Sequence, residues 1–230
     1  MVISMKKEFT VKKEKINGVL AHKIYRVLFD EENKEEFQSF RFLVLNIEEE
    51  EAREKIADIF VELFGKSAVL YINERPVIFY FNNQGYEVKN FLWSIIDDFG
   101  IKVSIFNSGK ISSKEAFFTI YRLYEKYISS KKFHYFSVGD LVLEIIKKDM
   151  QDLEKYRKIL LNDIEDNQQL EKLILAMFDN NLNITKTAKD VYMHRNTINN
   201  KLEYIKKETG MNMQEFKDAV SMYWLIKSKS

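Results

Sequence analysis

Residues 167–210 read NQQLEKLILAMFDNNLNITKTAKDVYMHRNTINNKLEYIKKETG, and this stretch decides the fold of the C-terminal part of the chain. Apolar residues recur at helical spacing over 170–178, which predicts an amphipathic helix that ends at an asparagine pair. A short second helix, opened by Asn183 or Ile184, is expected over 184–192, with the turn at 192–194. The third helix begins near residue 195 and ends at about 207, before a glycine. Three short helices joined by such turns indicate a helix-turn-helix.

The apolar positions of this stretch define which side of each helix faces inward. Ala188 and Val191 are expected to face the core from the second helix, and Ala188 is small where two backbones come close. In the third helix, Ile198, Leu202 and Ile205 follow the i, i+4, i+7 pattern of a buried stripe. The opposite side of the third helix is therefore expected to face solvent.

That opposite side carries residue types suited to DNA. Arginine can pair with guanine and asparagine with adenine in the major groove, whereas threonine and lysine suit phosphates. Asparagine is a poor helix former, so a cluster of asparagines costs stability that a purely solvating surface would not require. His194 is expected either to touch DNA or to cap the third helix. The predicted DNA-binding residues are Thr185, Lys186, His194, Arg195, Asn196, Thr197, Asn199, Asn200 and Lys201.

The segment from Asn181 to Gly210 resembles the C-terminal helix-turn-helix of the PucR/CdaR group of bacterial transcriptional regulators. Most of the resemblance lies in the run His194-Arg195-Asn196-Thr197-Ile198 and in the later Thr209-Gly210. A more distant similarity to the Fis-type helix-turn-helix is also present. The resemblance implies that Arg195, Thr197 and Lys201 contact DNA, and that Thr185 contacts a phosphate. Asn199-Asn200 replace a pair that is often basic or aromatic in the family, so the preferred DNA sequence is not implied.

The first part of the chain has a different pattern. Residues 1–38 form an N-terminal segment in which a helix is expected from about Lys13 to Phe29, although Asn17-Gly18 would also suit a hairpin. From Phe40 the predicted order is βαββαβα, with strands at 40–47, 68–72, 77–81 and 101–106. Two βαβ-like halves joined by a hairpin give a ferredoxin-like α+β domain over residues 39–137, with helices on one face of an antiparallel sheet. Residues 138–230 are expected to form an all-α domain, with the helix-turn-helix at 184–207.

The ferredoxin-like pattern also resembles the degenerate GGDEF-like domain that often precedes the DNA-binding end in this group. In an active nucleotide cyclase the hairpin between the second and third strands carries the GGDEF signature. Here that hairpin reads Ile72-Asn73-Glu74-Arg75-Pro76-Val77, with neither a glycine pair nor an Asp-Glu pair. The resemblance therefore implies a scaffold without catalytic residues.

Composition excludes several classes of protein. The 230 residues contain no cysteine and three histidines, which excludes disulfides and thiolate metal sites and disfavours a histidine metal site. We expect no cofactor and no catalytic residues, no membrane span, and a cytoplasmic location. The formal net charge is +1. Residues 183–230 hold nine Lys/Arg against five Asp/Glu, a net charge of +4 that leaves −3 on the preceding residues.

The leading hypothesis is a transcriptional regulator that binds double-stranded DNA as a homodimer and reads the major groove with helix 195–207. An alternative is a sensor module in which the ferredoxin-like domain binds a metabolite or nucleotide effector that controls DNA binding. A nucleotide cyclase is a third, disfavoured hypothesis because the signature is missing.

Overall fold

The computed structural model describes residues 9–81, 88–131 and 135–228. Contacts between Cα atoms divide the chain into two compact units. The α/β unit comprises Met1–Asn107, Ile111–Phe118 and Ser129–Tyr135, and the helical unit comprises Ser108–Lys110, Thr119–Ile128 and Phe136–Ser230. The domain boundary placed near residue 138 rests on periodicity and stays a prediction. Two short segments that precede it in sequence group with the helical unit by contact.

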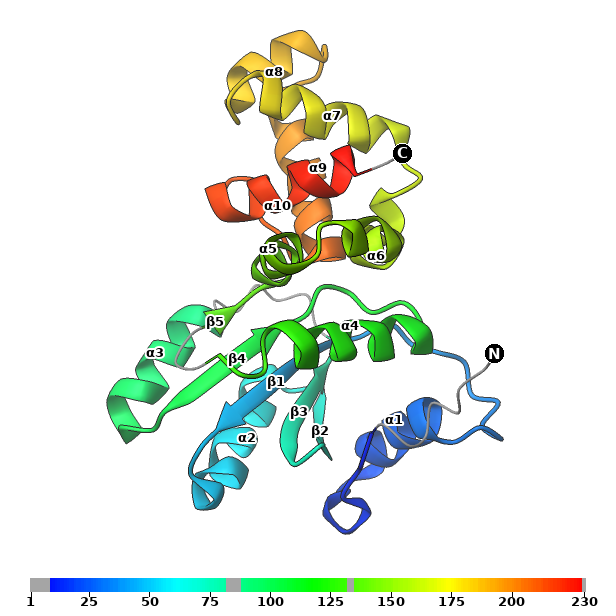
Figure 1. Cartoon of the computed structure of the whole chain (residues 1–230), viewed down its shortest axis with the longest axis vertical. Helices are drawn as coiled ribbons and strands as arrows, with labels where there is room; N and C mark the ends of the chain where they lie inside the picture. The colour runs from blue at the N-terminus through cyan, green and yellow to red at the C-terminus, as the bar shows by residue number, and fades with distance from the viewer. Residues whose placement is uncertain (1–8, 82–87, 132–134, 229–230) are drawn as a thin grey trace. The chain divides into compact units, whose positions relative to one another are not determined.

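The α/β unit contains the predicted βαββαβα order (Figure 1). Its elements are η2 (Lys13–Lys15), α1 (Val19–Phe29), β1 (Arg41–Ile47), α2 (Glu50–Phe64), β2 (Ser67–Ile72), β3 (Arg75–Tyr80), α3 (Val88–Phe99), β4 (Val103–Asn107) and the start of α4 (Lys114–Tyr127). The sheet order is β2-β3-β1-β4-β5, where β5 is the two-residue strand Tyr135–Phe136. β1 pairs antiparallel with both β3 and β4, and β2 pairs antiparallel with β3. This arrangement confirms the ferredoxin-like α+β prediction.

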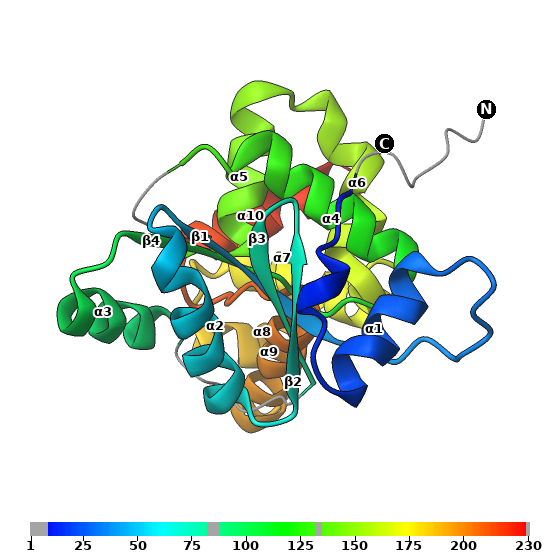
Figure 2. The ribbon, with the colours of Figure 1, turned by 90° about the horizontal axis from the view of Figure 1, so that it is seen from below.

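Both faces of the sheet are covered, whereas the sequence predicted helices on one face only. On one face, Phe60 of α2 and Leu92 of α3 belong to a buried cluster with residues of β1, β3 and β4, and α2 lies along β1, β2 and β3 (Figure 2). On the other face, the Phe117 ring packs against Phe42 and Phe79 at centroid distances of 5.2 and 5.6 Å. The one-face expectation was therefore wrong, because β1 is a continuous apolar run whose side chains are buried on both sides.

The β2–β3 hairpin is tighter than the sequence suggested. Asn73 and Glu74 form a two-residue turn with φ angles of 47° and 65°, the left-handed conformation that type I′ hairpins require at both central positions. Pro76 lies inside β3, where it pairs with Tyr71, and β1 begins to pair with β3 only at Val77. The missing N–H of Pro76 therefore costs no bond to β1.

The N-terminal helix is shorter than predicted. A 3₁₀ turn occupies Lys13–Lys15, and the α-helix starts only at Val19, after Gly18 with a φ angle of 83°. Glycine adopts this conformation readily, so it separates the two helical pieces. The helix α1 then lies beside β2 (Figure 2). The predicted helix is confirmed over its second half.

The helical unit consists, within the described ranges, of helices and their connections (Figure 1). Besides the end of α4, it contains α5 (Val138–Lys148), α6 (Gln151–Leu161), η3 (Asn162–Ile164), α7 (Gln168–Asp179), α8 (Ile184–Asp190), α9 (Arg195–Thr209) and α10 (Phe216–Lys227). The last helix packs against α5, α6 and α7. Among the helices that the structure describes, none combines the length and apolar character needed to cross a membrane.

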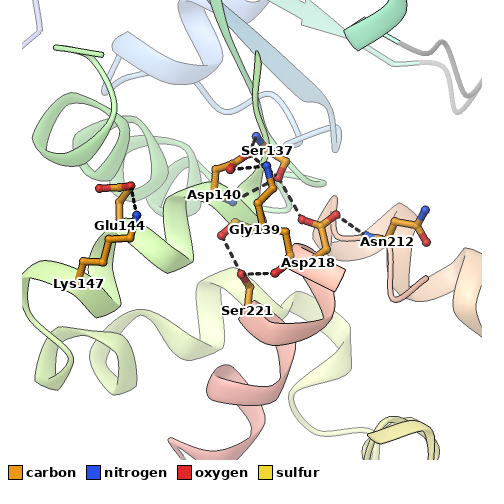
Figure 3. Close-up of polar contacts among 9 residues, drawn as sticks. Ser137, Gly139, Asp140, Glu144, Lys147, Asn212, Asp218 and Ser221 are labelled. Atoms are coloured by element: carbon orange, nitrogen blue, oxygen red, sulfur yellow. Dashed lines mark hydrogen bonds and ion pairs between the residues drawn. The ribbon is translucent and has the colours of Figure 1, made fainter. Parts of the chain in front are cut away.

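A buried carboxylate joins α10 to the start of α5 (Figure 3). Asp218 accepts hydrogen bonds from the Ser137 hydroxyl at 3.2 Å and from the backbone N–H of Asn212 at 2.8 Å. The Ser221 hydroxyl donates to the carbonyl of Gly139 at 2.8 Å, and a Cβ on Gly139 would lie 2.0 Å from the Asp218 carboxylate. Burial raises the pKa of Asp218 above its ordinary value of 3.8. The carboxylate therefore fixes three separate backbone segments at one point.

The loop Ser108–Lys110 packs against the C-terminal end of α9. The backbone N–H of Lys110 donates to the carbonyl of Glu208 at 3.0 Å, and the Lys110 ammonium contacts the Glu208 carboxylate at 2.9 Å. A Cβ on Gly109 would lie 2.5 Å from the carbonyl oxygen of Thr209. The loop between β4 and α4 therefore packs closely on the end of α9.

Candidate nucleic-acid interface

The helices α7, α8 and α9 form the predicted helix-turn-helix (Figure 1). Asn167 caps the first helix by accepting a hydrogen bond from the Leu170 N–H at 3.1 Å. One apolar stripe of this helix is fully buried: Leu170, Leu173, Ile174 and Met177. The helix is thus fixed in the unit by the residues whose spacing predicted it.

The turn between α7 and α8 has an uncommon backbone conformation. Asn181 and Leu182 have φ angles of 51° and 60°, and the Leu182 N–H donates to the carbonyl of Met177 at 2.7 Å. Asn183 then caps α8 by accepting from the Lys186 N–H at 3.0 Å. Asparagine is among the best N-cap residues because its side chain satisfies an amide that the helix leaves free. The second helix therefore starts where the sequence placed it.

The core residue of α8 differs from the prediction. Thr187 has an exposed fraction of 0%, whereas Ala188 and Val191 are only half-buried. The Thr187 hydroxyl donates to the carbonyl of Asn183 at 2.9 Å, so its polar atom is satisfied inside the helix. The hydroxyl oxygen also lies 3.5 Å from the carbonyl oxygen of Ala176, so the buried side chain contacts α7. Hydropathy alone could not indicate this, because the sequence pattern counts threonine as polar.

His194 caps the third helix. Its Nδ1 accepts a hydrogen bond from the Asn196 N–H at 3.2 Å, and α9 begins at the next residue. Of the two roles considered for His194, the structure shows the capping one. Its imidazole remains exposed, so whether it also contacts DNA stays a prediction.

The faces of α9 follow from its buried residues. Ile198, Leu202 and Ile205 are at most 5% exposed and hold the helix against the rest of the unit. At about 100° per residue, the direction opposite this stripe passes through Asn196 and Asn200. Arg195 and Asn199 lie along one edge of the exposed face, and Thr197 and Lys201 lie along the other.

The predicted DNA-binding residues lie together on the surface of α8 and α9. Eight of the nine are exposed, namely Thr185, Lys186, His194, Arg195, Asn196, Thr197, Asn199 and Asn200. Lys201 is half-buried, and its ammonium donates to the Gln169 side chain of α7 at 2.9 Å. The structure thus brings the nine side chains to two adjacent helices, with Lys201 at the edge.

The turn between α8 and α9 holds a residue that sequence reasoning missed. Tyr192 is 96% exposed and has a φ angle of 53°. The turn itself was expected at 192–194, but nothing in the sequence pattern indicates a left-handed tyrosine. Such a conformation becomes visible only in the backbone.

Comparison with known proteins identifies this region. The family model of the PucR C-terminal helix-turn-helix domain matches residues 170–227, about a quarter of the chain. No curated protein matches the sequence. The crystal structure of a regulator of polyketide synthase expression from Bifidobacterium adolescentis aligns over 84% of this chain and 81% of that one, with 10% identity and a TM-score of 0.38. The family match therefore assigns α7 to α10 to a PucR-type C-terminal helix-turn-helix domain, and it supports a DNA-binding transcriptional regulator.

Proposed function

We propose that this regulator reads a specific DNA sequence by inserting the N-terminal half of α9 into the major groove. The observation that carries this proposal is the exposed surface of Arg195, Asn196, Asn199 and Asn200 on a helix held by three buried apolar residues. A rigid helix presents these side chains to a groove in fixed positions. Arginine and asparagine have the donors and acceptors that distinguish base pairs there.

We assign the neighbouring helix α8 to contacts with the phosphate backbone of DNA. Thr185 and Lys186 lie in its first turn and are exposed. In helix-turn-helix complexes the helix before the recognition helix crosses the backbone, where hydroxyl and ammonium groups bond to phosphates. Thr197 and Lys201, on the edge of α9, are assigned to the same role.

The regulator is proposed to act as a homodimer on an inverted repeat. A single helix-turn-helix buries little surface on DNA, and useful affinity generally requires two half-sites about one helical turn apart. Effector binding by the α/β unit stays a prediction that this proposal does not require.

Selection from random DNA by the purified full-length protein, at fixed salt, tests the proposal. We expect an enriched inverted repeat with wild-type protein, and loss of that enrichment with Arg195→Ala, Asn199→Ala and Asn200→Ala. Gln214→Ala is a matched control, because Gln214 is exposed between α9 and α10. Equal recovery of all sequences by the wild-type protein would refute sequence-specific reading.

A further inference from the structure

Tyr192 occupies a backbone position that favours glycine. The helix α8 ends at the C-cap residue Val191, and Tyr192 follows with a φ angle of 53°. The Met193 N–H donates to the carbonyl of Ala188 at 3.0 Å, and the Tyr192 N–H donates to that of Lys189 at 3.4 Å. These two bonds define a Schellman motif, whose left-handed residue is usually glycine.

The chain uses glycine at the left-handed cap of α9, where Gly210 has φ and ψ angles of 75° and 5°. Positive φ angles after α6 and α7 fall on Asn162, Asn181 and the half-buried Leu182. Among the residues that the structure describes, Tyr192 is the one aromatic residue with a positive φ. A residue with a Cβ in this conformation is strained, and bulky side chains are uncommon there.

The tyrosine side chain gains little in the unbound protein to offset this strain. It is 96% exposed, so its ring buries almost no apolar surface. Strain held at a position without compensating packing is characteristic of functional sites. The ring therefore points to a contact made with something outside the chain.

We infer that Tyr192 is an additional DNA-backbone contact, with its phenol O–H donating to a phosphate at the edge of the major groove. The inference rests on the proposed function, because it needs α9 in the groove. Tyr192 lies three residues before Arg195, and Lys186, Lys189 and Arg195 are exposed on the same two helices. Tyrosine hydroxyls are common phosphate donors, and such contacts fix the register of a protein on DNA without reading sequence.

The decisive variant is Tyr192→Gly in the full-length protein, because the inference gives it two effects of opposite sign. Removing the strain should raise the urea midpoint of unfolding. Removing the phosphate contact should weaken binding to the selected DNA by about tenfold for each subunit, which corresponds to one hydrogen bond to a charged group, and so by about a hundredfold for the proposed homodimer. Tyr192→Phe, which keeps the ring and loses the hydroxyl, should show most of the loss in affinity without the gain in stability.

The kind of contact is tested by salt and by sequence. A neutral hydroxyl releases no bound cation, so the slope of log Kd against log salt should be the same for wild type and Tyr192→Phe. A loss of affinity that is uniform over different DNA sequences supports the phosphate assignment. A loss confined to particular bases overturns it.

Asn181→Gly is the matched control for strain relief. Asn181 is exposed, has a φ angle of 51° and lies in the turn between α7 and α8. Its replacement should not change DNA affinity. Unchanged affinity in Tyr192→Gly, together with lost affinity in Arg195→Ala, would refute this inference and leave the proposed function standing. Absence of specific binding by the wild-type protein would instead refute the proposed function.

Discussion

Replacing Gly109 with alanine tests whether the loop Ser108–Lys110 supports the end of α9 in solution. An alanine Cβ would lie 2.5 Å from the Thr209 carbonyl oxygen, 2.6 Å from its carbon and 3.1 Å from the Glu208 carbonyl oxygen. All three atoms belong to backbone, so no side-chain rotation relieves the overlap. The loop or the last turn of α9 must move.

The expected cost combines three contributions. Overpacking of this kind costs about 1–3 kcal/mol. The hydrogen bond from the Lys110 N–H to Glu208, at 3.0 Å, contributes about 0.5–1.5 kcal/mol and is lost if the loop moves away. The φ angle of Gly109 lies outside the left-handed region, so alanine also reduces the entropy of the unfolded chain and returns about 0.4–1 kcal/mol. The net destabilisation is expected to be about 2 kcal/mol.

Urea unfolding followed by tryptophan fluorescence measures this cost. The chain has two tryptophans, and Trp93 is 48% exposed, so a Trp93→Phe background leaves Trp224 of α10 as the reporter of the helical unit. Gly65→Ala is the contrasting control, because its Cβ meets nothing within 4 Å and its φ angle of 66° is what makes alanine unfavourable. Gly65 lies in the α/β unit, so this variant is followed in a protein that keeps Trp93. An unchanged or higher midpoint for Gly109→Ala would refute the close packing of the loop on α9.

Three further predictions concern the helical unit. Burial raises the pKa of Asp218, so the folded state binds this proton more tightly than the unfolded state does. The stability that Asp218 contributes should therefore fall as the pH rises from 3.8 through the raised pKa. Asp218→Asn should remove this pH dependence of the urea midpoint. A pH profile identical in both proteins would contradict this. Asn183→Ala should lower the free energy of unfolding by about 1 kcal/mol, because it removes the cap of α8, whereas Asn183→Asp should retain the cap. Equal urea midpoints for the two variants would argue against the cap. Lys201→Met breaks an exposed bond to Gln169 and should change stability by less than about 1 kcal/mol. Its salt slope for DNA binding should nevertheless fall by about one unit for each subunit, or about two units for the proposed homodimer, and an unchanged slope would exclude a phosphate contact by Lys201.

Much of the fold could be predicted because the signals are local. The strand β1 is an apolar run, and α9 repeats its apolar residues every three or four positions, which defines its buried side. The regular geometry of an α-helix then places Asn196 and Asn200 opposite that side, whatever elements pack against the helix. For the same reason, the candidate DNA-binding residues of α9 were predicted correctly as exposed, apart from the half-buried Lys201.

Other features depend on backbone conformation. The type I′ turn at Asn73-Glu74 and the left-handed Tyr192 have no clear sequence signal, since neither Glu74 nor Tyr192 is a residue that favours positive φ. Thr187 was missed as a core residue because its burial depends on a hydroxyl bond within its own helix. In each case the surrounding structure overrides the preference of the single residue.

By itself, the sequence determined the element order, the helix-turn-helix and the exposed face of α9, because each is set by periodicity within one segment. Only the tertiary structure decided that Gly109 packs against Thr209 and that Asp218 meets Ser137, since these pairs are brought together by segments far apart in the chain. Periodicity indicates which side of a helix is buried but not what it is buried against. The partners are fixed by close packing and by the need to satisfy each buried polar group, which are properties of the whole folded unit.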